Sequence, residues 1–205
     1  MVDANTEKRR AKLEELKLDT ESNYVLYAPT LRKMTGKSRT AQQVQNLDFL
    51  QILETLEHTF DGRWIFLVRS HVKVPGLQGV PDSAAILDVS KIEDMADLLL
   101  VSDFLITDYS SSAGDFALKG KPIVLYQDDR TTYEANERTF YFELGSSPFW
   151  ITTNQEELIQ TIQDIPNRSV EKNCRDILEF YGANETGNSS LDSAKKIADW
   201  CNCHA

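Results

Sequence analysis

The chain has 205 residues, of which 41% are hydrophobic and 26% charged, so it is long enough to bury the core of one α/β domain. Its net charge of −10 and pI of about 4.8 argue against a general nucleic-acid binder and against an electrostatic membrane anchor, because both need a basic face. No apolar run approaches the ~20 residues of a membrane span. The polar N-terminus also lacks the apolar core of a signal peptide, so we expect a cytosolic location.

The three cysteines do not form a disulfide framework, because their number is odd and two lie at the C-terminus. Cys201, Cys203 and His204 have a spacing that resembles a metal site. They form a single cluster near the chain end, so we predict no metal ligands there.

The elements expected along the chain alternate between strands and helices. Thr6–Leu18 has the pattern of an amphipathic helix, so residues 1–20 are predicted to be an N-terminal helix or linker and residues 21–205 the main domain. Buried strands are predicted at Tyr24–Ala28, Trp64–Val68, Ala84–Val89, Phe104–Ile106 and Pro122–Tyr126, with short extended pieces at Thr139–Leu144 and Phe149–Thr153. Helices are predicted at Ala41–Phe60, from Ser90 to Leu99, and at Ala113–Leu118, Gln155–Asp164, Val170–Phe180 and Leu191–Cys201. Ser90 and Glu93 have the spacing of a capping box for the second of these helices.

The chain is organised around residues 101–115, where a buried strand runs into a serine-rich turn and a helix. Ser110 and Ser111 stand where the helix begins, and serine is favoured there because its hydroxyl accepts a bond from a first-turn N–H. Free N–H groups, the helix dipole and hydroxyl donors at the end of a parallel strand also suit an anion such as phosphate. The alternative is a plain capped helix after a core strand.

Alternating strands and helices predict a Rossmann-like, doubly wound parallel sheet. Right-handed crossovers then bring the carboxyl end of every strand to one rim, where open α/β sheets bind ligands. The residues expected on that rim are Thr30, Arg32, Arg69, His71, Asp108, Ser110, Ser111 and Asp128. They indicate a phosphate or nucleotide site.

Several motifs carry a resemblance to a known family. They are Tyr27-Ala28-Pro29-Thr30-x-Arg32, Arg69-x-His71, Asp88-Val89-Ser90, Ser102-Asp103-x-Leu105-Ile106-Thr107-Asp108-Tyr109-Ser110-Ser111, Asp115-Phe116, Lys121-Pro122-Ile123, Tyr126 and Asp128. In this order they resemble the C-terminal half of the CDP-glycerol glycerophosphotransferases, the teichoic-acid and capsule polymerase family, over Tyr24–Trp200. The resemblance implies one half of a GT-B arrangement, which binds the CDP-linked donor, while the acceptor and a second catalytic histidine come from an N-terminal half that this chain lacks.

The resemblance also implies a role for each rim residue. His71 is expected to be catalytic or phosphate-binding, and the donor-binding residues are expected to be Pro29, Thr30, Arg32, Arg69, Thr107, Asp108, Ser110, Ser111 and Asp128. The implied activity is transfer of glycerol phosphate, or ribitol phosphate, from the CDP-activated polyol donor to a hydroxyl of a polyol-phosphate or glycan acceptor. No cofactor is indicated, although Asp128-Asp129 leaves a divalent metal open. The enzyme is expected at the inner face of the cell membrane through parts not present here.

Two other classes of function remain open at this point. One is a non-catalytic nucleotide- or phosphate-binding module, and the other is a related GT-B enzyme that uses UDP- or GDP-sugars. The preferred nucleotide would discriminate between them.

Overall fold

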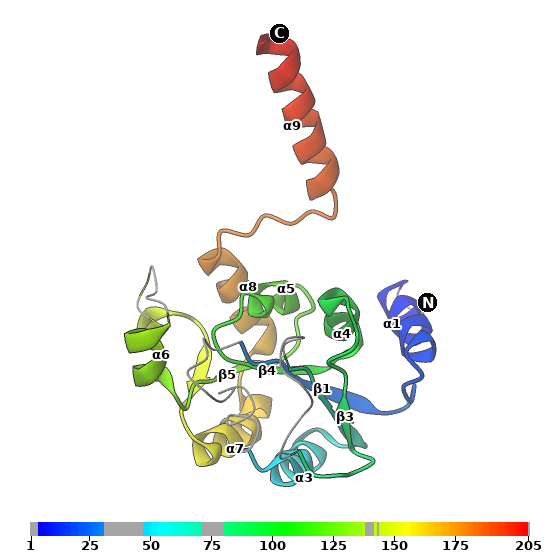
Figure 1. The fold of residues 1–205 in the computed structure, drawn as a ribbon, viewed down its shortest axis with the longest axis vertical. Coiled ribbons are helices and arrows are strands. Elements are labelled where there is room, and N and C mark those ends of the chain that lie inside the picture. The colour runs from blue at the N-terminus through cyan, green and yellow to red at the C-terminus, as the bar shows by residue number, and fades with distance from the viewer. Residues whose placement is uncertain (1–3, 31–46, 71–79, 138–141, 143, 205) are drawn as a thin grey trace.

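The computed structural model describes residues 4–30, 47–70, 80–137, 142 and 144–204. These residues form a six-stranded parallel sheet in the order β3-β2-β1-β4-β5-β6 (Figure 1). The strands are β1 (Asn23–Tyr27), β2 (Trp64–Val68), β3 (Ile86–Asp88), β4 (Phe104–Thr107), β5 (Ile123–Tyr126) and β6 (Trp150–Thr152). The predicted doubly wound α/β fold is therefore confirmed.

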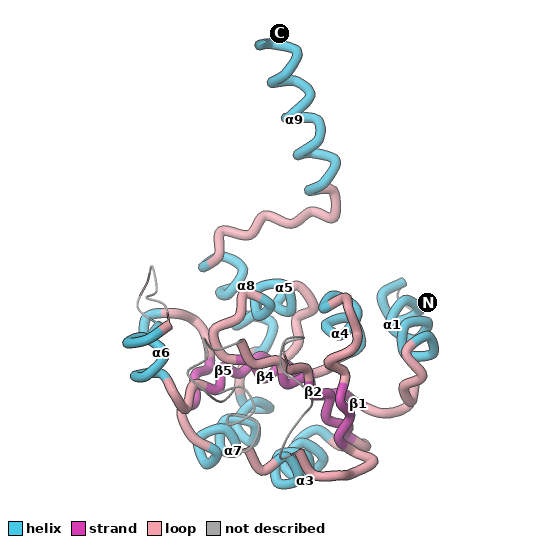
Figure 2. Tube along the Cα trace, in the orientation of Figure 1, coloured by secondary structure: helices cyan, strands magenta, loops and turns pink. Residues whose placement is uncertain are grey.

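Helices cover both faces of the sheet (Figures 1 and 2). One layer holds α1 (Ala4–Glu15), α4 (Met95–Val101), α5 (Ser112–Ala117) and α8 (Val170–Phe180), and the other holds α3 (Phe49–Phe60) and α7 (Gln155–Asp164). The remaining helical elements are α6 (Arg130–Asn136), the 3-10 turns η1 (Leu144–Ser146) and η2 (Ile165–Asn167), and α9 (Ser189–His204). Within the described ranges, no helix combines the length and apolar character that a membrane crossing requires.

The central strand β1 explains why the sequence shows unbroken apolar runs. Successive side chains of a strand point to opposite faces, so Tyr24 and Leu26 pack under α1, α4, α5 and α8 while Val25 and Tyr27 pack under α3 and α7. All four are buried, with at most 1% of the side chain exposed. A strand covered on both faces must be apolar at every position.

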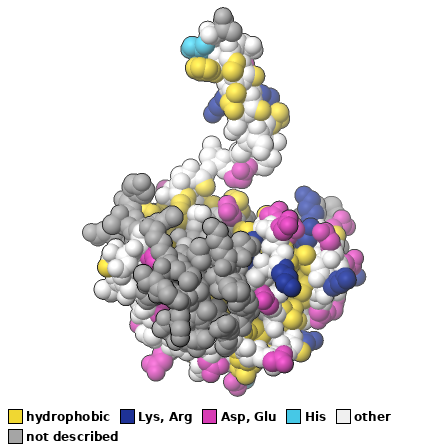
Figure 3. Space-filling view, viewed as in Figure 1, with side chains coloured by type: hydrophobic (Ala, Val, Ile, Leu, Met, Phe, Trp, Pro, Cys, Tyr) yellow, Lys and Arg dark blue, Asp and Glu magenta, His cyan; other side chains and the backbone are white. Residues whose placement is uncertain are grey.

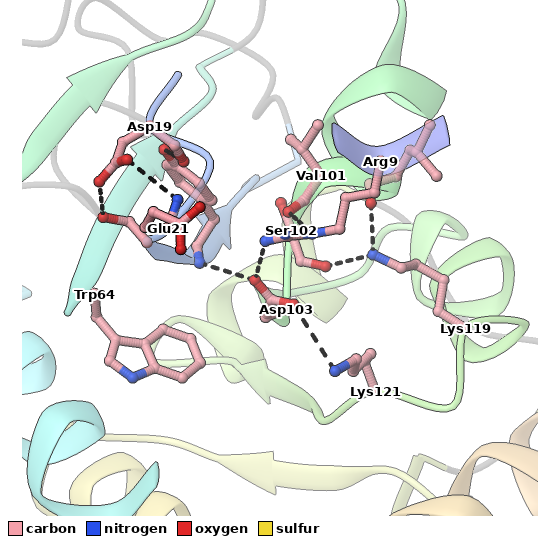
Figure 4. Close-up of polar contacts among 12 residues, drawn as sticks. Arg9, Asp19, Glu21, Trp64, Val101, Ser102, Asp103, Lys119 and Lys121 are labelled. Atoms are coloured by element: carbon pink, nitrogen blue, oxygen red, sulfur yellow. Dashed lines mark hydrogen bonds and ion pairs between the residues drawn. The ribbon is translucent and has the colours of Figure 1, made fainter. Parts of the chain in front are cut away.

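The N-terminal helix α1 is packed onto the domain. Leu13 is fully buried, and the Arg9 guanidinium donates to the Val101 carbonyl at 3.1 Å and to the Asp103 carboxylate at 2.6 Å (Figure 4). The same carboxylate accepts a bond from the backbone N–H of Tyr24 at 3.1 Å. The helix predicted over Thr6–Leu18 is therefore present as α1, and it ends at Glu15 rather than Leu18.

Two helix starts differ from the predictions. The helix expected from Ala41 begins, within the described residues, at Phe49, because Asp48 caps it by accepting from the Gln51 N–H at 3.0 Å; residues 41–46 lie outside the described ranges. The capping box at Ser90 and Glu93 is wrong.

Helix α4 starts only at Met95, and its cap is Asp94, which accepts from the Ala96 N–H at 2.8 Å. The Ser90 hydroxyl instead accepts from the backbone N–H of Ser70 at 2.9 Å. The Ser90 hydroxyl therefore joins the ends of the neighbouring strands β2 and β3 instead of capping a helix.

The segment after β5 also differs from the predictions. Helix α6 was not predicted. The extended piece predicted to end at Leu144 instead has Leu144 in the 3-10 turn η1. Residues 139–141 and 143 of that piece lie outside the described ranges.

Candidate functional site

The candidate site lies where the strand order reverses. Strand β1 pairs with β2 on one side and with β4 on the other. The next described helix after β1 is α3 on one face of the sheet, and the helix after β4 is α5 on the other face. In doubly wound sheets the ligand crevice lies at such a point, beyond the carboxyl ends of the two strands. Pro29 and Thr30 follow β1, and residues 108–111 follow β4. Arg69 follows β2 and the half-buried Asp128 follows β5. The described residues of the predicted rim therefore share one edge of the sheet, while Arg32 and His71 lie outside the described ranges.

Asp108 links the segment that follows β4 to the segment that follows β1. Its carboxylate is 1% exposed and accepts bonds from the Thr30 N–H at 2.9 Å and from the Thr30 hydroxyl at 2.6 Å. Next to it, the buried Thr107 hydroxyl donates to the Ala28 carbonyl at 2.7 Å. These contacts favour a positioning role for Thr107 and Asp108, and their predicted contact with the donor stays a prediction.

The two serines of the turn differ in what their hydroxyls do. The Ser110 hydroxyl lies 2.8 Å from the Ser112 hydroxyl and accepts from the Ser112 N–H at 3.3 Å, so it stabilises the turn. Ser111 is exposed and makes no side-chain cap. Helix α5 has only six residues, so its dipole is weaker than a long helix would provide. Ser111 is consequently the better candidate for a ligand contact.

Arg69 supplies positive charge at the β2 end of the rim. Its guanidinium donates through Nη2 to the carbonyls of Ile92 at 3.3 Å and Glu93 at 2.9 Å. Burial lowers the pKa of Arg69, and the nearby Asp94 opposes that effect. An arginine stays protonated in proteins and carries five N–H donors, so donors beyond the Nη2 group remain for an anionic ligand.

A stacked pair of tyrosine rings, which the sequence did not predict, lies beside the serine turn. The rings of Tyr109 and Tyr133 stack with centroids 3.8 Å apart and an interplanar angle of 15°. The Tyr109 hydroxyl donates to Asp129 at 3.2 Å, and the fully buried Gln127 donates from Nε2 to the Asp108 carbonyl at 3.1 Å. Only Tyr109, inside the organising stretch, could have been singled out from the sequence.

Two cavities open next to this turn and share Ser111 and Tyr181. The rim cavity, of about 210 Å³, is lined by Asp108, Tyr109, Ser110, Ser111, Ala113, Leu125, Phe142, Phe149 and Tyr181. The side cavity, of about 350 Å³, is lined by Ser111, Gly114, Asp115, Leu118, Leu178, Tyr181, Ala183, Asn184, Glu185 and Ser189. The Tyr181 ring lies so close to Gly114 that a Cβ there would be 3.0 Å from two ring carbons. Aromatic rings, two serines and the Asp108 carboxylate line the rim cavity, whereas the side cavity combines carboxylates with apolar side chains.

Comparison with known proteins identifies the family. The family model of CDP-Glycerol:Poly(glycerophosphate) glycerophosphotransferase matches residues 1–191. The chain belongs to this family.

Two named relatives show how much of a family member this chain covers. The teichoic acid poly(glycerol phosphate) polymerase of Bacillus spizizenii is 29% identical over 188 residues, which cover 91% of this chain and 46% of the polymerase. The teichoic acid glycerol-phosphate transferase of Staphylococcus aureus is 32% identical over 157 residues, covering 76% of this chain and 39% of the transferase. This chain therefore spans less than half the length of either relative.

Among solved structures, a variant of the wall teichoic acid polymerase TagF superposes on the chain with a TM-score of 0.67 at 24% identity. The match covers 97% of this chain and 49% of that structure. At this identity the likeness establishes the shared fold alone.

Within the run Ile106–Ser111, buried and exposed positions differ. Ile106, Thr107 and Asp108 are buried, whereas Ser111 faces solvent. In the part of the chain that the structure describes, no three His, Cys, Asp or Glu side chains are grouped to hold a metal ion.

Proposed function

We propose that this chain is the donor-binding half of a polyol-phosphate transferase. It would serve the transfer of glycerol phosphate, or ribitol phosphate, from a CDP-linked donor to an acceptor hydroxyl in teichoic-acid or capsular polysaccharide synthesis. The observation that carries the proposal is the family match over residues 1–191. The reversal of strand order between β1 and β4, which is where doubly wound sheets bind nucleotides, supports it.

In the proposed reaction the acceptor oxygen attacks the distal phosphorus of the donor. A new phosphorus–oxygen bond forms, the bond to the CMP oxygen breaks, and the acceptor proton passes to a base in the other half of the enzyme. The Ser111 hydroxyl, nearby N–H groups and the Arg69 guanidinium would bind the pyrophosphate and stabilise the charge on the departing CMP. His71 would contribute as a phosphate-binding or acid–base group. Positioning and charge stabilisation supply most of the catalysis in phosphoryl transfer.

The proposal requires partners beyond this chain. The acceptor would be a polyol-phosphate or glycan chain, and the second half of the GT-B arrangement would bind it. We assign no cofactor and no nucleic-acid partner. The enzyme would act in the cytoplasm at the inner face of the membrane, held there by parts outside this chain.

Calorimetric titration with CDP-glycerol, CDP-ribitol, CMP and UDP tests the proposal. We expect the cytidine ligands to bind in preference to UDP. Ser111→Ala and His71→Ala should each weaken binding about tenfold, as expected for loss of one hydrogen bond to a charged group. Ser193→Ala, which removes an exposed hydroxyl on α9, is the matched control and should bind like wild type.

The alternative functions predict other results. Preference for UDP or GDP would favour a sugar-nucleotide enzyme. Absence of nucleotide binding, both in the folded chain and in a parent polypeptide that carries the first half, would contradict the transferase. If the cytidine ligands bind and neither rim substitution weakens that binding, the donor site lies elsewhere than on this rim.

A further inference from the structure

Gln127 is a polar side chain that the fold leaves completely buried. It follows directly after β5, which lies next to β4 in the sheet (Figure 1), and none of its surface is exposed. Its Nε2 group donates to the Asp108 carbonyl at 3.1 Å, and only the nitrogen end of the amide can do this, because a carbonyl accepts but does not donate. Among the described residues, no donor reaches Gln127 Oε1.

Stability alone does not account for a glutamine at this position. Asp108 is 1% exposed, so its carbonyl needs a donor, and Gln127 supplies one. The same side chain introduces Oε1, a second buried acceptor, which has no donor within the described ranges. One unpaired acceptor is thus exchanged for another, and methionine, which has a similar size, would give about the same free energy of unfolding. What the bond does provide is a fixed backbone at Asp108.

Asp108 begins the turn Asp108–Ser111 and is held from both neighbouring strands. On the β1 side, the Thr30 N–H and hydroxyl donate to its carboxylate. On the β5 side, Gln127 holds its backbone carbonyl, one position past the end of the strand. The peptide group that joins Asp108 to Tyr109 is planar, so a fixed carbonyl also fixes the direction in which the chain enters the turn.

The turn carries two backbone donors whose direction depends on that entry. In the part of the chain that the structure describes, neither the Ser110 N–H nor the Ser111 N–H donates a hydrogen bond. By contrast, the Ser112 N–H donates to the Ser110 hydroxyl at 3.3 Å and the Gly114 N–H to the Ser111 carbonyl at 2.9 Å. Successive backbone N–H groups bind an anion when they converge on it, so their orientation decides how well they do so.

The charge of the chain makes this orientation important. The net charge is −10, and Asp and Glu side chains are spread over much of the described surface in the space-filling view (Figure 3). Long-range attraction of an anion by the whole chain is therefore not available, and binding depends on donors that are already oriented at short range. Loss of the support of the turn should lower affinity even though no contact with the ligand is removed.

We propose, on the basis of the proposed function, that Gln127 is a positioning residue for the pyrophosphate of the donor. It acts through the Asp108 carbonyl and does not touch the ligand. Its side chain holds the turn Asp108–Ser111 in the conformation that leaves the N–H groups of Ser110 and Ser111 available.

Hydrogen exchange in the ligand-free chain tests the effect on the turn. Gln127→Met removes the bond to Asp108 and keeps the volume of the side chain. The Gly114 amide, which donates to the Ser111 carbonyl, should exchange about tenfold faster in this variant, as expected for loss of one supporting hydrogen bond. The urea midpoint of the variant should equal that of wild type, because one unpaired buried acceptor replaces another. Faster exchange of all slow amides in proportion would overturn the proposal, since it would show a general loss of stability.

Thr152→Val is the matched control. The buried Thr152 hydroxyl donates to the Leu125 carbonyl at 3.3 Å, on the side of β5 that pairs with β6 and not with β4. This variant also removes one side-chain bond to a carbonyl of the sheet, and Gly114 should exchange in it as in wild type. Unchanged Gly114 exchange in Gln127→Met, or an equal increase in Thr152→Val, would overturn the proposal.

Calorimetric titration with CDP-glycerol tests the effect on the ligand. Gln127→Met should bind about tenfold more weakly than wild type, and Thr152→Val should bind like wild type. Equal affinity of wild type and Gln127→Met would overturn the positioning role. If wild type binds neither CDP-glycerol nor inorganic pyrophosphate, alone or in a parent polypeptide with the first half, the proposed function and the ligand role of Gln127 both fail. The exchange data then still decide whether Gln127 holds the turn, so the two failures are distinguishable.

Discussion

Lys119 gives a prediction that can be worked out in magnitude. Its ammonium group donates to the carbonyls of Leu99 and Leu100 at 2.8 Å and to that of Ser102, so it caps the C-terminal end of α4 (Figure 4). Burial lowers the pKa of Lys119 from 10.5 to about 8, with Asp103 opposing the shift. The perturbation is Lys119→Met, which keeps the aliphatic stem and removes the ammonium.

The pH dependence follows from where the proton is lost. Below pH 8 the ammonium is charged in both the folded and the unfolded chain, so pH has no effect through Lys119. Between pH 8 and pH 10.5 the folded chain has released a proton that the unfolded chain still holds, so the free energy of unfolding rises with pH. At about 1.36 kcal/mol per pKa unit, the gain from pH 7 to pH 9 is about 1.3 kcal/mol.

Urea unfolding at pH 7, 8 and 9 measures this gain. The unfolding free energy of wild type minus that of Lys119→Met should increase by about 1.3 kcal/mol from pH 7 to pH 9. Taking this difference cancels the contributions of the groups that titrate in both proteins. Lys172→Met removes an exposed ammonium on α8 and should follow wild type. A difference that stays constant with pH would refute the reasoning, and would mean that the three carbonyls solvate the charge as well as water does.

Three more predictions concern the site and its surroundings. Thr30→Val should lower the free energy of unfolding by about 1.5–3 kcal/mol, because it removes a hydroxyl that donates to the buried Asp108 carboxylate; Thr30→Ser keeps the hydroxyl, and equal loss in both variants would contradict this account. In the folded chain at pH 8, a thiol reagent should modify the two exposed cysteines of α9 but not Cys174, whose thiol is buried with a pKa of about 11. Reaction of all three thiols before unfolding would show that Cys174 is accessible. Gly114→Ala should lower the melting temperature by about 2–4 °C, because its Cβ would displace the Tyr181 ring. An unchanged melting temperature would mean that the ring moves without cost.

The elements predicted best are those whose bounds follow from their own pattern of apolar residues rather than from contacts with distant residues. The bounds of β2, α7 and α8 are as predicted, and β1 and β5 differ by about one residue. Helix α6 was not predicted because it has no apolar period, since Tyr133 is its only buried residue. The start of α4 was wrong because a capping pattern cannot reveal that the Ser90 hydroxyl bonds to Ser70.

For the candidate site, the sequence predicted which residues share the rim but not how they are used. The placement of Thr30 and Asp108 at one edge follows from the parallel fold, whereas the bond between them depends on the pairing of β1 with β4. The distinction between Ser110 and Ser111 depends on the backbone of the turn. Both are tertiary facts that a pattern of residue types does not contain.

The position of β1 in the sheet has a consequence for the order of folding. β1 pairs with β4, and the contact from Thr107 to Ala28 joins residues 79 positions apart. Such long-range pairs form slowly, and during synthesis β1 must wait until β4 has left the ribosome. Until then one edge of an apolar strand is unpaired and prone to aggregation. The crevice proposed to bind the nucleotide is therefore assembled late, and a nascent chain that ends before β4 has neither a protected β1 nor a binding site.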